Sequence, residues 1–219
     1  MTIGNNAFYN CSKLEKEEVN LPNLTSLGQN AFYGVKIKKM NLGALVTLPA
    51  ATTSSQTYGD KSVLEEVILS ENVKSIPSDS FLGYTKMKTI NLQNVVEFGS
   101  SSLKNSGLQE LNNTIVESIG GAAFAGSAIE RVVLGDKLST LPNTNYTTAV
   151  FRGCSKLKHF EIDSQLDTLG ASTFEGCHSL KAVILRGCIT PPSIFGSTFL
   201  TTNSTFLIYV PDASVEAYK

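Results

Sequence analysis

Pairs of apolar residues three positions apart recur along the chain, and the second member of each pair is followed by Gly or Pro. Because Gly and Pro interrupt regular structure, each pair closes a short segment. From Ile3 to Leu169 the second members lie 21 to 28 residues apart, which indicates one short unit repeated in tandem. The pairs are Leu24/Leu27, Leu45/Leu48, Val73/Ile76, Val95/Phe98, Val116/Ile119, Leu138/Leu141 and Leu166/Leu169.

Two further columns keep the same register as these pairs. After each pair comes an aromatic-rich position, followed by the signature apolar-x-x-apolar-x-apolar, as in Leu64/Val67/Leu69. The last two apolar residues of the signature lie two apart, which is the period of a β-strand. The aromatic-rich column contains Phe8, Phe32, Phe81, Leu103, Phe124, Phe151 and Phe174.

One such coil cannot bury its own apolar face, but stacked coils can. The signature strands of successive coils would pair in parallel about 4.8 Å apart, whereas the Ala-Phe-x-Gly segment is too short for a free helix. We therefore predict an α/β fold, a right-handed leucine-rich-repeat solenoid of about eight coils. Its parallel β-sheet would line the concave face, with short helical turns or irregular segments on the other wall.

The C-terminal part of the sequence departs from the repeat. Pro191 and Pro192 cannot continue a hydrogen-bonded strand, and residues 205–210 and 213–218 predict a strand and a short helix. We expect residues 1–189 to form the solenoid and residues 190–219 a C-terminal cap of the same domain, which covers the last coil. The N-terminal coil has no such cover, so we expect a monomer that can make end-to-end contacts through this coil.

Irregular stretches interrupt the repeat. Residues 50–61 and 143–149 are polar insertions that we expect to bulge into solvent, where they are either binding loops or tolerated insertions. A smaller insertion, Glu17-Glu18, blurs the register of the first signature strand. Asn113 replaces an apolar signature residue, which predicts a local bulge or an Asn bonded to neighbouring backbone.

The x positions of the signature face solvent and form three columns across the predicted sheet. In one column Lys38, Glu65 and Lys88 alternate in sign, which predicts a ladder of ion pairs. These columns contain no Trp, Tyr or Phe, so exposed tyrosines in turns and insertions are equally good candidates. The candidate protein-binding residues are Asn41, Ile68, Asn91, Asn112, Arg131, Val133 and His159 on the sheet, with Tyr58 and Tyr146 in the insertions.

Composition excludes several classes of partner. The formal net charge is −1, whereas nucleic-acid binding requires a basic face. No apolar run approaches the roughly 18 residues needed to span a bilayer, so we expect no membrane insertion in this fragment. The first residues enter directly into repeat sequence and contain no signal peptide.

Few residues of the sequence are candidates for catalysis or metal binding. His159 and His178 belong to different repeat columns, and the sequence contains no G-x-S-x-G, H-E-x-x-H or phosphate-loop motif. Cys11, Cys154 and Cys177 share one repeat position, and their spacing is not a zinc pattern. We predict no enzyme, no cofactor and no metal site. The cysteines are buried free thiols, or Cys154 and Cys177 form a disulfide between consecutive coils.

Residues 3–11 (IGNNAFYNC), 151–157 (FRGCSKL) and 174–180 (FEGCHSL) resemble the BspA-like leucine-rich repeats of bacterial surface proteins, as does the closing segment 190–219. The resemblance covers essentially the whole chain. It implies an extracellular or cell-surface protein, and some members of the family are adhesins. The resemblance therefore implies a non-catalytic protein-interaction module, an adhesin for host or bacterial surface proteins. A structural spacer of a larger surface protein, with no ligand of its own, is the alternative.

Overall fold

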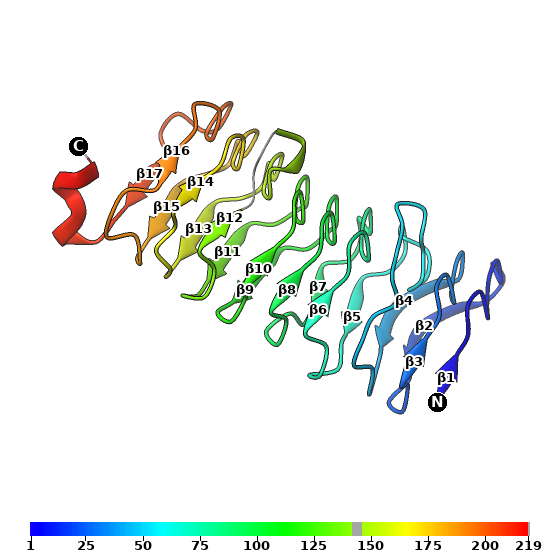
Figure 1. The fold of residues 1–219 in the computed structure, drawn as a ribbon. Helices are drawn as coiled ribbons and strands as arrows, with labels where there is room; N and C mark the ends of the chain where they lie inside the picture. Colours follow the sequence, from blue (N-terminus) through cyan, green and yellow to red (C-terminus); the bar gives the residue numbers. More distant parts are fainter. Residues whose placement is uncertain (142–145, 219) are drawn as a thin grey trace.

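The chain folds into a single row of stacked coils, shown in Figure 1 from the N-terminal coil in blue to the C-terminal coil in red. The computed structural model describes residues 1–141 and 146–218. Each signature forms a strand, and with one break in the middle of the row the strands of successive coils pair in parallel. The described residues form about nine turns, against the predicted number of about eight. Residues assigned to the cap form the strand of the ninth coil.

The signature strands form two parallel sheets along one wall. The first sheet has the order β2-β4-β5-β7, and the second has the order β9-β11-β13-β15-β17. Their bounds are β2 (Glu15–Asn20), β4 (Lys36–Asn41), β5 (Glu66–Ile68), β7 (Thr89–Ile90), β9 (Glu110–Asn113), β11 (Arg131–Leu134), β13 (His159–Ile162), β15 (Ala182–Leu185) and β17 (Leu207–Tyr209). We call the outward-facing side chains of these two sheets the signature face.

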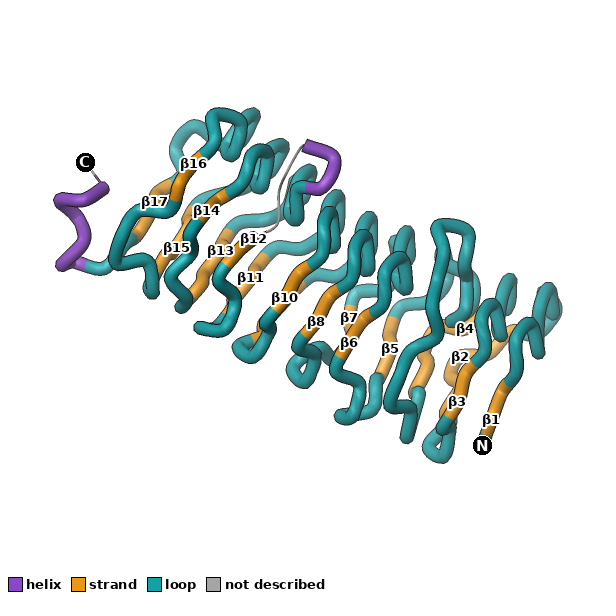
Figure 2. The backbone as a smooth tube through the Cα atoms, viewed as in Figure 1, coloured by secondary structure: helices purple, strands orange, loops and turns teal. Residues whose placement is uncertain are grey.

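A second wall consists of two-residue strands that also pair in parallel (Figure 2). The strands are β1 (Thr2–Ile3), β3 (Ser26–Leu27), β6 (Ser75–Ile76), β8 (Glu97–Phe98), β10 (Ser118–Ile119), β12 (Thr140–Leu141), β14 (Thr168–Leu169) and β16 (Ser193–Ile194). Six of these strands, β3, β6, β8, β10, β12 and β14, end on the second residue of an apolar pair, so most pairs mark a second ladder that the sequence analysis did not predict.

The segments around the aromatic column form a third ladder and are turns, not helices. Phe8 N–H donates to Ala31 O at 2.7 Å, and Phe81 N–H donates to Ser102 O at 2.7 Å, in each case in the next coil. Residues with left-handed backbone, such as Asn10 (φ 56°) and Gly34 (φ 72°), turn alternate N–H groups towards that coil. Of the two predictions for this region, irregular segments are confirmed and helical turns are wrong, because the N–H groups bond between coils.

The helix content of the described residues consists of two 3₁₀ segments, η1 (Tyr146–Thr148) and η2 (Asp212–Tyr218). The fold is therefore a parallel β-solenoid, and the α part of the predicted class is absent from the described chain. η2 follows β17 and packs on the turn after β15, where the Tyr218 hydroxyl donates to Cys188 O at 3.1 Å. Tyr218 packs against the core, and Ile208, the interior residue of β17, is 41% exposed.

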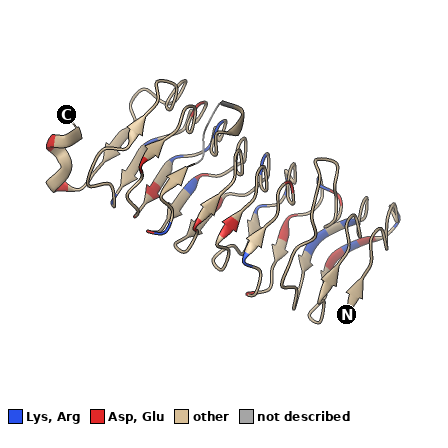
Figure 3. Cartoon of the chain, in the orientation of Figure 1, with Lys and Arg blue, Asp and Glu red and all other residues tan. Residues whose placement is uncertain are grey.

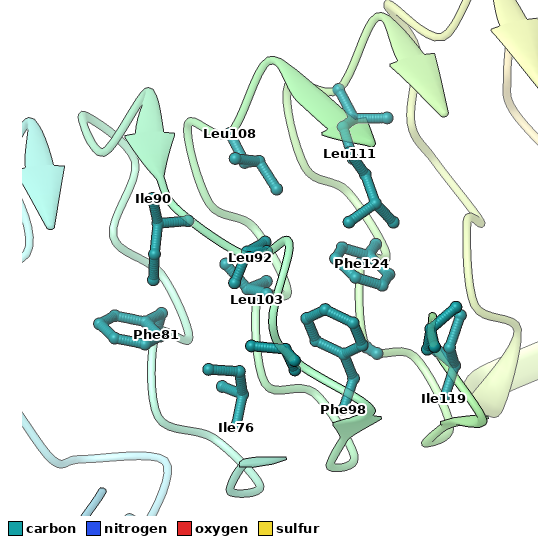
Figure 4. Packing of buried hydrophobic residues seen from close by; sticks show 14 of the residues in the cluster. Ile76, Phe81, Ile90, Leu92, Phe98, Leu103, Leu108, Leu111, Ile119 and Phe124 are labelled. Carbon is teal, nitrogen blue, oxygen red and sulfur yellow. The ribbon is translucent and has the colours of Figure 1, made fainter. Parts of the chain in front are cut away.

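The core lies between the walls and contains one apolar side chain from each repeated column. Figure 4 shows Ile76, Phe98 and Ile119 of the short strands pointing towards Ile90 and Leu111 of the signature strands. The aromatic column stacks from coil to coil, with ring centroids 5.6 Å apart for Phe124–Phe151 and 5.5 Å apart for Phe174–Phe199. Leu69, Leu92 and Leu134 are all buried, as the shared interior row requires.

The insertion at residues 50–61 is only partly a bulge. Thr52, Thr53 and Ser54 are exposed, but Tyr58 is fully buried and stacks on Phe81 with centroids 4.6 Å apart. The prediction that this insertion exposes Tyr58 is wrong, because Tyr58 takes the aromatic position of its coil. Tyr84 is buried against the same two rings.

Asn113 is buried at a position where the repeat has an apolar residue. Its amide forms hydrogen bonds with neighbouring backbone groups. Its Nδ2 donates to Leu92 O at 2.9 Å and Val95 O at 2.7 Å, and its Oδ1 accepts a hydrogen bond from Ile115 N at 3.0 Å. β9 pairs with β11 through Asn113↔Leu134 without a break in register. Of the two predicted outcomes, the structure has the Asn bonded to neighbouring backbone and not the bulge.

The first signature strand is regular. Glu15↔Lys36, Glu18↔Lys39 and Asn20↔Asn41 keep one offset along the whole of β2 and β4. The prediction of an insertion at Glu17-Glu18 that blurs the register is therefore wrong. Constant register also sets Glu17 beside Lys38, whose Nζ lies 2.9 Å from Glu17 Oε2.

Candidate functional site

The five-stranded sheet carries two outward rows of the signature face. Strand pairing aligns Glu110, Arg131, His159, Ala182 and Leu207 in one row, with Asn112, Val133, Glu161, Ile184 and Tyr209 in the next. The predicted residues Asn112, Arg131, Val133 and His159 thus lie on neighbouring strands. Parallel pairing places side chains of one row directly beside one another, so these two rows form a continuous surface.

Arg131 and Arg186 connect the acidic residues of this surface in a chain of ion pairs. Arg131 lies 3.9 Å from Glu110 and 3.7 Å from Glu161, and Arg186 contacts Glu161 and lies 3.8 Å from Asp163. Acidic and basic residues alternate in the same way along the other coils (Figure 3). Exposed pairs of this kind stabilise a fold by about 0–1 kcal/mol each and offset one another's field.

The ladder of ion pairs exists, but not with all the predicted partners. Lys158 donates to Glu130 at 2.6 Å, and this hydrogen bond lowers the pKa of the Glu130 carboxyl. The predicted Lys38–Glu65–Lys88 ladder is not among the ion pairs of residues 1–141. Lys38 bonds Glu17 instead, because β2 and β4 are in constant register.

Apolar side chains gather at the C-terminal end of the signature face. Tyr209 and Leu207 are 50% and 57% exposed and lie beside Ile184 and Ala182. A hollow of about 480 Å³ opens here, lined by Ile184, Arg186, Tyr209, Val210, Pro211 and Asp212. We call Ile184, Arg186, Leu207, Tyr209 and Asp212 the Tyr209 cluster.

Sequence reasoning missed the Tyr209 cluster. The expectation that the outward columns lack aromatic residues is wrong, because Tyr209 pairs with Ile184 in the same column. Pro191 and Pro192 had marked residues 190–219 as a cap. The alternation Leu207-Ile208-Tyr209 was the signal that could have placed Tyr209 on the outward side.

A second hollow lies where the two sheets separate, between β7 and β9. It measures about 370 Å³, and its lining includes the predicted residues Ile68 and Asn91 together with Glu66, Lys88 and Glu110. The Asn91 amide is occupied, since it accepts from Leu69 N at 2.6 Å and donates to Leu69 O at 2.9 Å. Ile68 is the predicted residue that remains an open apolar contact in this hollow.

The other predicted residues lie elsewhere. Asn41 is on β4, and its Oδ1 accepts a hydrogen bond from Gly43 N at 3.0 Å within its own turn. Tyr58 is buried in the core and cannot contact a ligand. Tyr146 begins η1, but its side chain lies outside the described part of the structure, as do residues 142–145 of the second insertion.

The cysteines of the described chain are free thiols, so the structure has the first of the two predicted alternatives. Cys154 Sγ lies 3.1 Å from Phe124 O, and Cys177 Sγ lies 3.3 Å from Phe151 O. Burial raises the pKa of Cys154 to about 11 and raises the pKa of Cys177 further. Both thiols stay protonated near neutral pH, and the thiolate is the nucleophile. The prediction is wrong for Cys11, which is exposed in the first coil.

The histidines lie in different environments, as their columns predicted. His159 is part of the signature face beside Arg131, whereas His178 Nδ1 lies 2.7 Å from Thr201 O in an aromatic turn. Within the described residues, no group of three or more His, Cys, Asp or Glu could hold a metal ion. None of the described helices has the length and apolarity that crossing a bilayer requires.

The fold and its surface define a repeat protein built as a parallel β-solenoid. The BspA type leucine rich repeat region, in six copies, matches residues 1–109 and 97–213 of the chain. The chain therefore belongs to the BspA-type leucine-rich-repeat family, and the resemblance found in the sequence is confirmed.

Two solved structures are similar to this chain. A leucine rich cell surface protein from Faecalibacterium prausnitzii A2-165 is 16% identical with a TM-score of 0.48, over 99% of this chain and 78% of that chain. A leucine-rich repeat protein from Bacteroides ovatus ATCC 8483 is 20% identical with a TM-score of 0.40, over 97% of this chain and 73% of that chain. No curated protein matches the chain.

Proposed function

We propose that the chain is a non-catalytic protein-interaction module displayed at the cell surface, where it acts as an adhesin for a host or bacterial surface protein. Membership of the BspA-type family supports this proposal. The fold supports it as well, because stacked repeats offer an extended surface that can contact a large partner. The signature face is the surface that we assign to binding.

The observation that carries the proposal is the Tyr209 cluster beside the Arg131 ion-pair chain. Residues that dominate binding energy at protein interfaces are enriched in Tyr and Arg and sit in apolar surroundings with a polar rim. Tyr209, Leu207 and Ile184 supply the apolar centre. Arg131, His159, Asn112 and Val133 continue the surface along the neighbouring strands.

A binding module also fits the chemistry that the described residues offer. The buried thiols of Cys154 and Cys177 are protonated and closed to solvent. His159 and His178 lie on different walls, so they cannot act together on one bound group. Covalent and acid–base catalysis needs a nucleophile and a base within hydrogen-bond reach.

A structural spacer is the second candidate, and one observation favours it. The charges of the signature face largely satisfy one another, as in the chain Glu110–Arg131–Glu161–Arg186. The amides of Asn41 and Asn91 bond to backbone. Polar groups that are already paired within the surface are less available to a charged or polar ligand.

The experiment is an array of purified extracellular matrix proteins and bacterial surface proteins probed with the chain. We expect binding to at least one protein, and Tyr209→Ala and Arg131→Ala should each weaken it at least tenfold. Val46→Ala is the matched control, because Val46 is an exposed apolar residue of the turn after β4 and lies outside the signature face. A loop variant lacking Thr52, Thr53 and Ser54 tests the insertion. Binding that survives both substitutions contradicts the assigned surface, and no binding at all supports the spacer.

A further inference from the structure

The third coil (residues 45–69) and the fourth coil (residues 73–92) are joined by one of the three hydrogen-bonded ladders. Their signature strands β5 and β7 pair through Val67 and Ile90. No backbone hydrogen bond joins their short-strand walls or their aromatic turns, all of which lie within the described residues. Across residues 1–141 and 146–218, every other boundary between coils keeps at least two ladders. This boundary is therefore the one with the fewest backbone connections.

A proline interrupts the short-strand ladder at this boundary. The residue after β8 is Gly99, whose N–H donates to Ile76 O of the preceding coil at 2.8 Å. Pro77 takes the same position after β6 and has no N–H group. Leu48 O of the third coil therefore lacks the bond that the repeat would supply. Residues 45–48 form no strand, and the short-strand wall has a gap between β3 and β6 (Figure 2).

The polar insertion interrupts the aromatic ladder at the same boundary. Tyr58 takes the aromatic position of the third coil, but its N–H donates to the Tyr84 hydroxyl at 3.4 Å and not to a backbone carbonyl. Gly59 N–H donates to Gln56 O within its own coil. The two turns therefore contact each other mainly through side chains, as in the stack of Tyr58 on Phe81.

A hollow of about 360 Å³ lies where the short-strand wall is interrupted. Residues 46–48 line it from the third coil, and Asn72, Lys74, Ser75 and Pro77 line it from the fourth. Val46 at its edge is 57% exposed. The two coils thus lie close on the signature wall and leave open space between them on the second wall.

The opposite wall is interrupted at the next boundary. Between the fourth and fifth coils β6 pairs with β8, and Phe81 N–H donates to Ser102 O, but β7 does not pair with β9. The fourth coil is therefore attached to the third by its signature strand, and to the fifth by its short strand and aromatic turn.

We propose that the fourth coil is a hinge at which the first three coils bend relative to the coils that follow. Each ladder fixes the spacing of neighbouring coils on its own wall. Where β5 and β7 alone stay paired, the other two walls can separate; where β7 and β9 are unpaired, the signature wall can open. Hinge motions use a few residues at the ends of elements. Such bending changes the curvature of the signature face without unfolding a coil, and it does not depend on the proposed function.

The first test measures distances between spin labels by double electron–electron resonance in a Cys11→Ser background, because Cys11 is the exposed thiol. Labels at Ser26→Cys and Ser118→Cys lie four coils apart across the hinge. Labels at Glu97→Cys and Ser193→Cys are the matched control, since they lie four coils apart beyond it. All four positions are exposed in one outward row of the short strands.

Both labelled pairs should have mean separations near four coil spacings, which is about 19 Å between backbones. We expect the distance distribution across the hinge to be at least twofold wider than that of the control pair. Equal widths, or a wider distribution in the control pair, overturn the hinge.

The second test is hydrogen exchange of the native chain at urea concentrations below the unfolding midpoint. The amides of β4 and β5 should lose protection together, in one opening that leaves β11 and β13 protected. A single opening shared by all four strands overturns the hinge. A loss of protection that proceeds coil by coil, with no step between β5 and β7, overturns it as well.

Discussion

Replacing Phe151 with alanine is expected to lower the free energy of unfolding by about 3–5 kcal/mol. Phe151 is fully buried, and its ring lies between Phe124 and Phe174 with a third contact to Phe160. Alanine would leave a cavity in the aromatic column that the two flanking coils cannot both close, because their backbones are held by the ladders on either side. The loss of stability combines the transfer free energy of the removed ring atoms with the cost of the cavity.

The measurement is urea denaturation followed by far-ultraviolet circular dichroism, with the slope compared between variants so that a change in midpoint reports stability. Phe195→Ala is the matched control, since Phe195 is an exposed phenylalanine of the ninth coil. Its effect should stay within about 0.5 kcal/mol. If Phe151→Ala costs no more than Phe195→Ala, the aromatic column is not the interior row of the stack.

Replacing Asn113 with leucine is expected to destabilise the chain by about 1–3 kcal/mol, although leucine is the residue that the repeat favours at this position. Asn113 bonds Leu92 O, Val95 O and Ile115 N from a buried site. Leucine would remove the bonds to Val95 O and Ile115 N, whereas Leu92 O would keep its hydrogen bond from Val95 N at 3.0 Å. A buried polar group that loses its partner costs more than the added apolar contact returns.

Asn112→Leu serves as the control for this second substitution, because Asn112 is the adjacent residue and faces solvent. Thermal unfolding of both variants under identical conditions compares the two sites. We expect a clear fall in melting temperature for Asn113→Leu and little change for Asn112→Leu. A variant Asn113→Leu that melts at or above the temperature of the parent chain would contradict the assigned role of the amide.

Most of the fold follows from the sequence because one physical requirement repeats in every coil. Val132, Phe160 and Val183 must face the interior, and alternation along their strands then turns Arg131, His159 and Glu161 outwards. A shift by one residue would reverse every side chain, so the register is strongly determined. The positions of the signature strands from β4 to β15 could therefore be predicted without coordinates.

The short-strand wall was not predicted because a strand of two residues is too short to show the alternation of apolar and polar positions. Ser118 and Ile119 pair with Glu97 and Phe98, but two positions cannot show alternation. Their extended conformation is decided by the neighbouring coils, which is information that a single sequence window does not contain.

The two incorrect assignments of tyrosines have one cause. Polar residues around Tyr58, and prolines before Tyr209, made both segments resemble departures from the repeat. In the structure each tyrosine continues a column, Tyr58 inwards on Phe81 and Tyr209 outwards beside Ile184. Column membership was hidden by the changed spacing, so it becomes visible only when the coils are stacked. The proposed binding surface was less predictable than the fold because it depends on Tyr209.

Hydrogen–deuterium exchange in the native chain tests most directly whether the coils form one continuous stack. We predict strong protection of the amides of residues 131–134, 159–162 and 182–185 and of the aromatic turns between them, with fast exchange at residues 52–54. The protected segments should recur once for each signature strand from β4 to β15. Fast exchange throughout the signature strands, with protection confined to isolated segments, would contradict the stacked solenoid.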